Sequence, residues 1–341
     1  MISIGVIGYG YWGPNLVRNF MDLDRFRVGG ISDFSDKRRA AAASRCPGAK
    51  ITESPMALIE DPSIDAIAIA TPVSTHFELA AAALRAGKHV LVEKPITASS
   101  DEAKQLVDLA AKHGRTLMVD HTFVYNGAIR KVKDLIDRGS LGDVLYYDSV
   151  RVNLGLFQHD VNVIWDLAVH DVSIVQYLFA KNPTEVSAIG MSHVKGQTEN
   201  VAYVTLMYDE PLLVHLHVNW LAPVKIRQTL IGGTKQMVVY DDVETSEKVK
   251  VYDKGVELET RPDRVHELRV GYRSGDMFAP KIDSTEALRV MATHFADCVE
   301  SGKKPLTDGE AGLGIVQVLE AATFSMRHRG RPTKIGVSET L

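Results

Sequence analysis

Gly5-Val6-Ile7-Gly8-Tyr9-Gly10-Tyr11-Trp12-Gly13-Pro14-Asn15 is the stretch that decides the fold. The apolar run Ile2–Ile7 leads into glycines spaced as G-x-G-x-x-G, and a helical pattern over Leu16–Phe20 follows. This order is typical of a dinucleotide-binding turn, because the turn is tight and the backbone must approach a pyrophosphate closely. The amide groups that open the next helix would face the negative charge. A plain glycine turn is the alternative. We call Gly8–Gly13 the glycine loop.

Strand-like and helix-like segments alternate through the first third of the chain. Short apolar runs of this kind suit strands that are buried on both faces, as in a parallel sheet. For two of the helices we expect a capping box at Thr75 and Glu78 and a capping serine at Ser100. The alternation predicts a doubly wound α/β sheet whose ligand lies at the carboxyl ends of the strands. The predicted strands are Ile2–Ile7, Val28–Ser32, Asp65–Ala70, His89–Val92 and Thr116–Val119.

Asp33 stands twenty positions after Gly13 and decides between cofactors. A carboxylate there would accept hydrogen bonds from the ribose hydroxyls of NAD and would repel the 2′-phosphate of NADP. The sequence therefore predicts NAD as the cofactor. Lys37 and Arg38 follow closely and are able to reach a phosphate, so NADP stays the alternative.

Glu93-Lys94-Pro95 closes the fourth predicted strand. Proline ends the strand, so the lysine is expected at the rim of the sheet. Over a nicotinamide, Lys94 would hydrogen-bond a substrate oxygen and stabilise the charge that develops there. A surface lysine beside a structural glutamate is an equally open interpretation.

A second cluster of polar residues lies at the start of a predicted helix over residues 165–178. Asp166 and His170 are four positions apart, so they share one face of that helix. We interpret His170 as a general base that Asp166 orients, and Asp171 as structural. A capped helix with one hydrogen-bonded histidine is the alternative.

Beyond Asp120 the pattern changes to successive strands, which predicts a second domain of α+β type with an antiparallel sheet. We therefore expect an NAD-binding domain over residues 1–120 and a substrate-binding and oligomerisation domain over residues 121–341. His215 and His217 share one face of a strand, but no third ligand is placed near them, so no metal is predicted. The expected strands are Val144–Val152, Glu185–Val194, Val201–Tyr208, Leu212–Leu221, Ile226–Ile231 and Gln236–Tyr240.

Composition restricts the class of protein. The chain has 341 residues, of which 45% are hydrophobic and 24% charged, with a formal net charge of −4. This length suits two domains that each bury a core. No basic run suggests a nucleic-acid partner, and no apolar stretch is long enough to cross a bilayer. Cys46 and Cys298 make no disulfide framework, which favours a reducing compartment. We expect a cytoplasmic protein that acts on a small molecule and binds neither nucleic acid nor membrane.

With the glycine loop, Glu93-Lys94-Pro95 and Asp166 to His170 in this order, the chain resembles the Gfo/Idh/MocA family of oxidoreductases. The resemblance implies a Rossmann domain, then a domain with a large open, mostly antiparallel sheet, and C-terminal helices that pack back on the first domain. It implies an NAD(P)-dependent oxidoreductase acting on CH–OH groups, with Lys94, Asp166 and His170 around the reacting carbon. Family members differ over whether lysine, histidine or tyrosine takes the proton. A homodimer or homotetramer is also implied.

Three shorter segments, Tyr11–Asn15, His121–Asn126 and Asn162–Asp166, resemble the nucleotide-sugar 3-dehydrogenases of that family, which act on UDP-N-acetylglucosamine or its uronate. The chain departs from common family patterns at Val161–Trp165 and at Ala168, where glycine is frequent. These departures bear on the sugar more than on the chemistry. A 3-keto sugar reductase, an inositol or free-sugar dehydrogenase and a non-catalytic NAD-binding regulator are the alternatives.

The strand ends and the resemblance together predict the site residues. Catalytic roles fall to Lys94, His170 and Asp166. Arg151 is expected either to pair with a substrate carboxylate or phosphate or to form a surface salt bridge. The predicted cofactor-binding residues are Gly8, Gly10, Tyr11, Trp12, Gly13, Asp33, Thr71, Pro72, His76, Glu93 and Lys94. The predicted substrate-binding residues are Lys94, His121, Tyr125, Asn126, Arg151, Asn153, Asn162, Trp165, Asp166 and His170.

Overall fold

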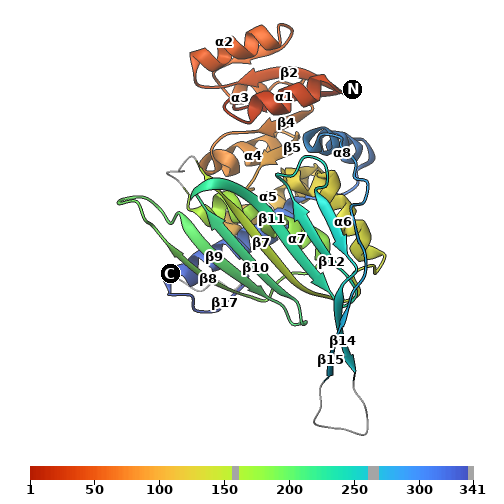
Figure 1. Ribbon diagram of the computed structural model, residues 1–341. Helices are drawn as coiled ribbons and strands as arrows, with labels where there is room; N and C mark the ends of the chain where they lie inside the picture. Colours follow the sequence, from red (N-terminus) through yellow and green to blue (C-terminus); the bar gives the residue numbers. More distant parts are fainter. Residues whose placement is uncertain (156–160, 260–268, 337–341) are drawn as a thin grey trace. The chain divides into compact units, whose positions relative to one another are not determined.

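The structure, a computed structural model, describes residues 1–155, 161–259 and 269–336 (Figure 1). The chain divides into two compact units. Unit 1 consists of Met1–Asn126 and Thr285–Glu320, and unit 2 consists of Gly127–Ser284 and Ala321–Leu341. Unit 1 is thus formed by two separate stretches of sequence, because the chain returns to it after most of unit 2.

Unit 1 is built on a six-stranded parallel sheet in the order β3-β2-β1-β4-β5-β6, which confirms the predicted doubly wound fold. The strand order reverses between β1 and β4, where sheets of this kind bind their ligands. The strands are β1 (Ile2–Ile7), β2 (Phe26–Ser32), β3 (Lys50–Thr52), β4 (Ala66–Ile69), β5 (His89–Glu93) and β6 (Leu117–Asp120). The helices are α1 (Gly13–Met21), α2 (Asp36–Arg45), α3 (Met56–Ile59), α4 (His76–Arg85), α5 (Ser100–His113) and α8 (Ala287–Ser301), with short 3₁₀ turns η1 (Val73–Thr75) and η2 (Thr122–Tyr125).

The strands of unit 1 form where the sequence is a short apolar run. Ile4 and Val6 of β1 and Ile67 of β4 are 0% exposed, as expected of parallel strands that are covered on both faces. The sequence patterns do not predict β3, because Lys50-Ile51-Thr52 is short and lies at the edge of the sheet.

Two predicted helix caps are wrong. Thr75 makes no capping bond, because its hydroxyl bonds instead to Thr71 Oγ1 (2.7 Å) and Pro72 O (2.8 Å) at the end of η1. Ser99, not Ser100, caps α5: its Oγ accepts from the amide of Glu102 at 3.3 Å. Ser99 has the extended backbone that a capping residue needs, whereas Ser100 is already helical.

Helix α8 belongs to unit 1 although it follows most of unit 2 in the sequence. Phe295 is 0% exposed and stacks on Phe26 of β2, with ring centroids 6.4 Å apart. Arg25 pairs with Asp297 at 2.5 Å and with Glu300 at 2.6 Å. Since burial of a large apolar side chain contributes about 1.5–3 kcal/mol, α8 is part of the core of unit 1 and not an appendage.

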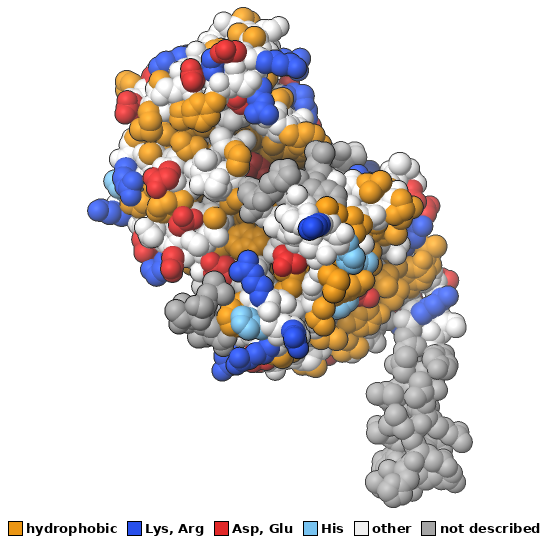
Figure 2. Space-filling view, turned by 90° about the vertical axis from the view of Figure 1, so that its left-hand side faces the viewer, with side chains coloured by type: hydrophobic (Ala, Val, Ile, Leu, Met, Phe, Trp, Pro, Cys, Tyr) orange, Lys and Arg blue, Asp and Glu red, His pale blue; other side chains and the backbone are white. Residues whose placement is uncertain are grey.

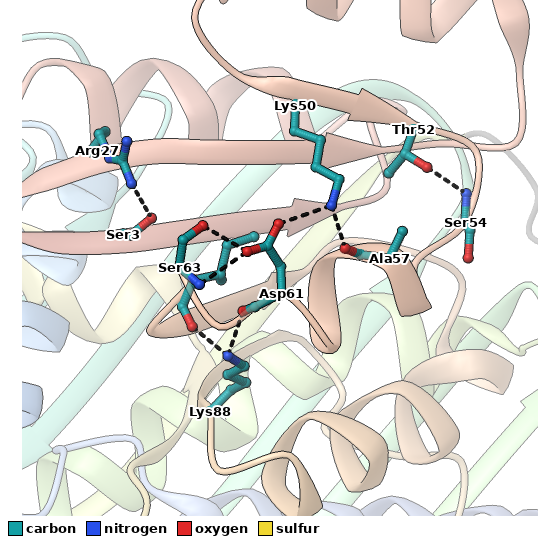
Figure 3. A network of polar contacts seen from close by, with 10 residues as sticks. Ser3, Arg27, Lys50, Thr52, Ser54, Ala57, Asp61, Ser63 and Lys88 are labelled. Carbon is teal, nitrogen blue, oxygen red and sulfur yellow. Dashed lines mark hydrogen bonds and ion pairs between the residues drawn. The ribbon is translucent and has the colours of Figure 1, made fainter.

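The buried side chain of Lys88 belongs to a polar network near the edge strand of the unit 1 sheet (Figure 3). Lys88 is 7% exposed, and its Nζ donates to the main-chain oxygens of Asp61 (2.8 Å) and Ile64 (2.6 Å). The Asp61 carboxylate accepts from Ser63 Oγ and from Lys50 Nζ of β3. These bonds hold the pKa of Asp61 below its usual range. The network therefore joins β3 to the turn that leads into β4.

Unit 2 is built on a nine-stranded sheet in the order β16-β13-β12-β11-β7-β10-β9-β8-β17. Strands β10 and β7 are parallel, whereas the other paired neighbours run antiparallel, which confirms the predicted open, mostly antiparallel sheet. Its strands are β7 (Val144–Leu154), β8 (Glu185–Met191), β9 (Val201–Met207), β10 (Leu213–Asn219), β11 (Leu221–Gly233), β12 (Met237–Asp241), β13 (Val249–Tyr252), β16 (Met277–Phe278) and β17 (Thr333–Lys334).

Helical segments of unit 2 include α6 (Gly127–Asp137), a π-helix η3 (Ile164–Ala168) and α7 (Val169–Phe179). Helix α9 (Gly309–Arg327) contains the boundary between the units. Strands β14 (Gly255–Glu259) and β15 (Arg269–Arg273) pair with each other as a separate ribbon, which Figure 1 shows extending from the end of the large sheet.

Strand β10 has one buried face and one open face, as its alternating sequence predicts. Val214, Leu216 and Val218 are 0% exposed. His217 lies on the opposite face, where its ring stacks on that of Tyr203 with centroids 4.5 Å apart. Hydrophobic and histidine side chains are neighbours on the surface shown in Figure 2. Among the residues described, no group of three or more His, Cys, Asp or Glu is placed to hold a metal ion. No helix within the described ranges is both long and apolar enough to cross a membrane.

The two faces of β10 predict contrasting effects of leucine truncation. Leu216 is 0% exposed and Leu213 is 51% exposed. Leu216→Ala should lower the free energy of unfolding by about 2–5 kcal/mol, because it leaves a cavity in the core. Leu213→Ala is the matched control and should change it by about 0.5 kcal/mol or less. Urea unfolding followed by circular dichroism measures both, and equal losses would contradict this assignment of the two faces.

Candidate active site

The glycine loop connects β1 to α1, and its glycines meet different needs. Gly8 has a φ of +96°, and a Cβ atom there would lie 2.5 Å from the carbonyl oxygen of Ala70. A Cβ atom at Gly13 would lie 2.1 Å from the carbonyl oxygen of Gly8, so the turn itself requires glycine at both positions. At Gly10 the nearest atom, Arg38 Nη1, would be 3.5 Å away, which is ordinary contact. The turn itself therefore does not require glycine at Gly10, and the guanidinium of Arg38 is the group nearest to that position.

Asp33 follows β2 directly and is held in place by the glycine loop. Its Oδ2 accepts from the amide of Tyr9 at 2.8 Å, and its Oδ1 accepts from the amide of Ser35 at 2.8 Å. The residue is 8% exposed. Arg38 Nη1 lies 3.6 Å from Asp33 Oδ2, so a positive charge stands beside the carboxylate. The end of β2 and the first turn of α2 thus bring together a carboxylate that suits a ribose diol and a guanidinium that suits a phosphate.

Trp12 links the glycine loop to the carboxyl end of β6. Its Nε1 donates to Asp120 Oδ2 at 3.2 Å, and its ring stacks on that of Tyr11 with 7° between the planes. Tyr11 is 86% exposed. Trp12 therefore makes contacts within the protein, whereas Tyr11 is the exposed member of the stack.

Two acidic side chains, Glu93 and Asp120, end the paired strands β5 and β6 in register with each other. Asp120 Oδ1 accepts from Thr122 Oγ1 at 2.6 Å, and Glu93 Oε2 accepts from the amide of Lys94 at 3.2 Å. Burial raises the pKa of Glu93 well above its usual value, and the neighbouring charge of Asp120 raises it further. Burial raises the pKa of Asp120 as well. Asp120 is buried and Glu93 is half-buried with its Oε1 enclosed, and two neighbouring carboxyl groups of this kind favour retention of a proton, with the larger rise in pKa at Glu93.

His121 follows Asp120 and is buried, at 1% exposed. Neither ring nitrogen has a hydrogen-bond partner among the described residues. Burial, with the charge of Lys94 as the second cause, lowers the pKa of His121 to about 3, so the ring is neutral. A neutral imidazole has one donor and one acceptor, and a buried polar group without a partner is costly. His121 is therefore suited to a ligand that brings a hydroxyl or an amide beside Lys94.

His76 joins two segments at the same edge of the sheet. Its Nδ1 lies 2.9 Å from Pro95 O and its Nε2 lies 2.8 Å from Thr71 O. Burial lowers the pKa of His76, and a neutral ring donates only one hydrogen bond at a time. His76 thus supports the loop that contains Thr71 and the exposed Pro72, and its described contacts are with the main chain.

Tyr125 and Asn126 lie at the end of η2 and directly after it. Tyr125 is 1% exposed, and its hydroxyl lies 3.1 Å from Thr307 Oγ1. Its ring packs near that of His294, with centroids 5.6 Å apart. These contacts place Tyr125 in the core of unit 1, whereas Asn126 is half-buried.

In unit 2, Asn162 caps the segment that carries the predicted catalytic pair. Its Oδ1 accepts from the amides of Ile164 (3.1 Å) and Trp165 (3.3 Å), as a capping asparagine does. The segment begins as the π-helix η3, not as the α-helix that the spacing predicts, and continues as α7. Single π turns are frequent at functional sites. Asp166 lies in this turn, and His170 lies at the start of α7.

Hydrogen bonds direct the side chains around the predicted catalytic pair, Asp166 and His170. Trp220, which is 0% exposed, donates from Nε1 to Asp166 Oδ2 at 3.0 Å. Trp165 Nε1 donates to Thr323 Oγ1 of α9 at 2.9 Å. Ser173 Oγ donates to the main-chain oxygen of His170 at 2.7 Å. The π turn and the first turn of α7 are therefore held by side chains as well as by their own backbone.

Arg151 is buried on β7 at 3% exposed, so the expected surface salt bridge is wrong. Its Nε donates to Asp171 Oδ2 at 2.7 Å and its Nη2 to Asp171 Oδ1 at 3.2 Å. The pair is internal because β7 is a central strand of its sheet. Asn153, two residues further along β7, is half-buried, and its Oδ1 has no partner among the described residues.

Each unit therefore gathers its own share of the predicted residues. The glycine loop, Asp33, Glu93 and His121 lie at the carboxyl ends of the unit 1 strands, and Asp166 and His170 share one short segment of unit 2. Sequence patterns did not predict the hydrogen bond from Trp220 to Asp166, because the alternation of apolar and polar residues marks Trp220 only as a core residue. They also missed the pairing of Arg151 with Asp171, which no sequence spacing indicates.

The raised pKa of Glu93 predicts a pH-dependent stability. Because its pKa is raised in the folded state, the native chain keeps a proton that the unfolded chain loses above about pH 4.3, and stability falls as the pH rises from there toward the folded pKa. Glu93→Gln should match the wild type at pH 4 and should raise Tm at pH 8 by about 2–4 °C, the shift that ~1 kcal/mol produces in a domain of this size. Thermal melts at both pH values measure this, with the exposed Glu78→Gln as control. A Glu93→Gln protein less stable at pH 8 than the wild type would contradict the assignment.

Two family models match the sequence. Residues 2–121 match an oxidoreductase family with an NAD-binding Rossmann fold, and residues 129–239 match the GFO/IDH/MocA C-terminal domain. The scyllo-inositol 2-dehydrogenase (NAD(+)) of Bacillus subtilis (strain 168) is 28% identical over 99% of this chain and 96% of that protein. The UDP-N-acetylglucosamine 3-dehydrogenase of Acidithiobacillus ferrooxidans is 30% identical over 59% of this chain and 62% of that protein. Matches to several other curated relatives span 53% to 58% of their own length.

A solved structure of a UDP-N-acetylglucosamine 3-dehydrogenase from Acidithiobacillus ferrooxidans has the same fold. It superposes with a TM-score of 0.81 over 96% of this chain and 98% of that chain, at 23% identity. The two matched domains agree in type and order with the structure. The Rossmann-fold match covers the glycine loop and the parallel sheet, and the C-terminal domain match falls on the open nine-stranded sheet. The chain therefore belongs to the Gfo/Idh/MocA family of NAD-binding oxidoreductases.

Proposed function

We propose that this oxidoreductase removes hydride from a secondary alcohol of a sugar, at C3 of a UDP-N-acetylhexosamine or its uronate. The observation that carries the proposal is the position of His121 near the charge of Lys94, at the carboxyl ends of β5 and β6. His121 is buried and neutral, and its ring nitrogens have no partner among the described residues. Such a group needs a polar ligand, and a polyhydroxylated sugar supplies one.

The proposed chemistry assigns one task to each residue. NAD, when bound, supplies the hydride acceptor. The Lys94 ammonium donates a hydrogen bond to the substrate oxygen and stabilises the negative charge that develops on it. His170 takes the hydroxyl proton, and Asp166, fixed by Trp220, orients the imidazole. Proton uptake by Lys94 in place of His170 is the alternative assignment.

The nucleotide sugar is favoured by two observations. Tyr11–Asn15, His121–Asn126 and Asn162–Asp166 resemble the nucleotide-sugar branch, and a relative named for UDP-N-acetylglucosamine is 30% identical. An inositol or free sugar is the second candidate, because a relative named for scyllo-inositol matches over 99% of this chain. Reduction of a 3-keto sugar uses the same residues in reverse. A panel of nucleotide sugars, inositols and free sugars, followed by absorbance of reduced nicotinamide, separates the candidate sugars. A non-catalytic regulator would reduce NAD with none of them.

The exposed face of the large sheet and the two thiols support proposals about assembly and location. We propose a homodimer or homotetramer joined through the face that carries Tyr203, His217 and the half-exposed Leu213, because an apolar surface of this kind is suited to a partner. Cys46 and Cys298 are buried free thiols, which supports a cytoplasmic location.

Lys94→Ala should lower kcat by about 10²–10⁴-fold, because it removes the group that stabilises the developing charge. NAD affinity, measured by quenching of protein fluorescence, should stay nearly unchanged. Lys104→Ala is the control, since Lys104 is an exposed lysine of α5 paired only with Asp108 in the described contacts. Turnover by Lys94→Ala within a few-fold of the wild type would remove Lys94 from the mechanism.

Asp33 should make the wild type prefer NAD over NADP, because its carboxylate repels a 2′-phosphate. Asp33→Ala should narrow or invert the ratio of kcat/KM for the two cofactors, with Arg38 then available to the phosphate. Asp36→Ala is the control: Asp36 is a neighbouring aspartate whose side chain is 95% exposed. A wild type that prefers NADP, or a ratio that Asp33→Ala leaves unchanged, would contradict this role.

A further inference from the structure

We propose that the buried ion pair between Arg151 and Asp171 positions His170 for proton transfer, so that Arg151 acts through the helix and does not contact the substrate. This inference rests on the proposed function, since it concerns the proposed proton acceptor. Arg151 and Asp171 are thus positioning residues, because neither touches the reacting atoms.

Two hydrogen bonds join Arg151 to Asp171, and we call this ion pair the clamp. Arg151 Nε and Nη2 donate to the two oxygens of the Asp171 carboxylate at 2.7 and 3.2 Å. Ser149 Oγ donates to Asp171 Oδ1 at 2.9 Å. Arg151 is 3% exposed and Asp171 is 1% exposed. Two parallel bonds from a planar guanidinium fix the orientation of a carboxylate as well as its position.

The clamp joins the start of α7 to the middle of the large sheet. Ser149 and Arg151 alternate along β7 and so project from the same face, and β7 lies between β11 and β10. Asp171 is the third residue of α7, directly after His170. Because successive residues are about 100° apart around a helix axis, fixing the direction of Asp171 also fixes the direction of His170.

Two further contacts hold the same segment from its other end. Asn162 caps the π turn, and Trp220 donates to Asp166. Together with the clamp they hold both ends of residues 162–171, which include both members of the proposed catalytic pair. Contacts at both ends restrain sliding and rotation of this segment on the sheet.

The use of an ion pair at this place favours a positioning role over a purely stabilising one. Burying two charges carries a large desolvation cost, and apolar side chains of similar volume often give the same or greater stability. Apolar contacts, however, have no preferred direction, whereas the guanidinium–carboxylate fork does. An ion pair at this place therefore adds orientation that a leucine or methionine would not.

A neighbouring ion pair provides a matched control. Arg227 of β11 lies opposite Arg151 in the sheet register, and its Nη1 contacts Asp242 Oδ2 at 3.2 Å. Asp242 also accepts from Tyr240 Oη at 3.0 Å. This second pair thus holds β11 and β12, and the described bonds of Asp242 involve no residue of α7.

The kinetic test compares Asp171→Asn and the apolar double variant Arg151→Met/Asp171→Leu with Asp242→Asn. Asp171→Asn should lower kcat by about 10–100-fold, the loss expected from a small misplacement of a catalytic group, with KM and NAD affinity nearly unchanged. The double variant should regain the wild-type Tm but keep the low kcat. Asp242→Asn should keep kcat.

A double variant with both wild-type Tm and wild-type kcat would show that the pair only stabilises the fold. A raised KM with unchanged kcat in Arg151→Met would show that Arg151 binds the substrate.

Amide hydrogen exchange over residues 162–173 provides a readout that needs neither turnover nor the double variant. Exchange in this segment should be faster in Asp171→Asn than in the wild type and unchanged in Asp242→Asn. Unchanged exchange in Asp171→Asn overturns the proposal. If the wild type oxidised no sugar in the panel, the proposed function would fail, while exchange would still show whether the clamp orders the segment.

Discussion

The parallel pairing of β1, β4, β5 and β6 is the constraint on which the site of unit 1 depends. Parallel strands end at the same edge of a sheet, so residues that follow them are neighbours in space even when they are far apart in sequence. Glu93 and Asp120 meet in this way, and Trp12 reaches Asp120 from the glycine loop. The edge thereby assembles a cofactor loop, a protonated carboxyl group and a neutral imidazole without any local sequence motif that contains all three.

Burial disfavours the charged form of a side chain in both units, but the neighbouring group differs between them. In unit 1 two carboxyl groups are adjacent, and burial keeps a proton on Glu93. In unit 2 an aspartate is adjacent to an arginine, and although burial lowers the pKa of Arg151, the opposite charge and the hydrogen bonds of Asp171 raise it by more. The carboxyl pair favours retention of a proton at the carboxyl ends of the unit 1 strands, and the ion pair fixes the direction of α7. Both consist of side chains that only the folded chain brings together.

The sequence predicts the features whose cause is local. Gly8 and Gly13 are required by a single turn, Asp33 ends a strand, and Leu216 alternates with polar neighbours, so each is visible in a short window. Trp220 and Arg151 have functions that depend on partners 54 and 20 residues away. No periodicity records such pairings, because they arise from strand order and register. The π turn at Ile164–Ala168 was also invisible, since its residues have ordinary helical spacing.

The discontinuity of unit 1 has a consequence for how the chain is made. A ribosome releases residues 1–126 well before Thr285–Glu320, so the nascent nucleotide-binding unit lacks α8 while unit 2 is being synthesised. During that interval the ring of Phe26 has no Phe295 to cover it, and Arg25 has neither Asp297 nor Glu300. Residues Gly127–Ser284 of unit 2 are therefore synthesised before the core of unit 1 is closed, and the early fragment presents apolar surface that a chaperone would recognise.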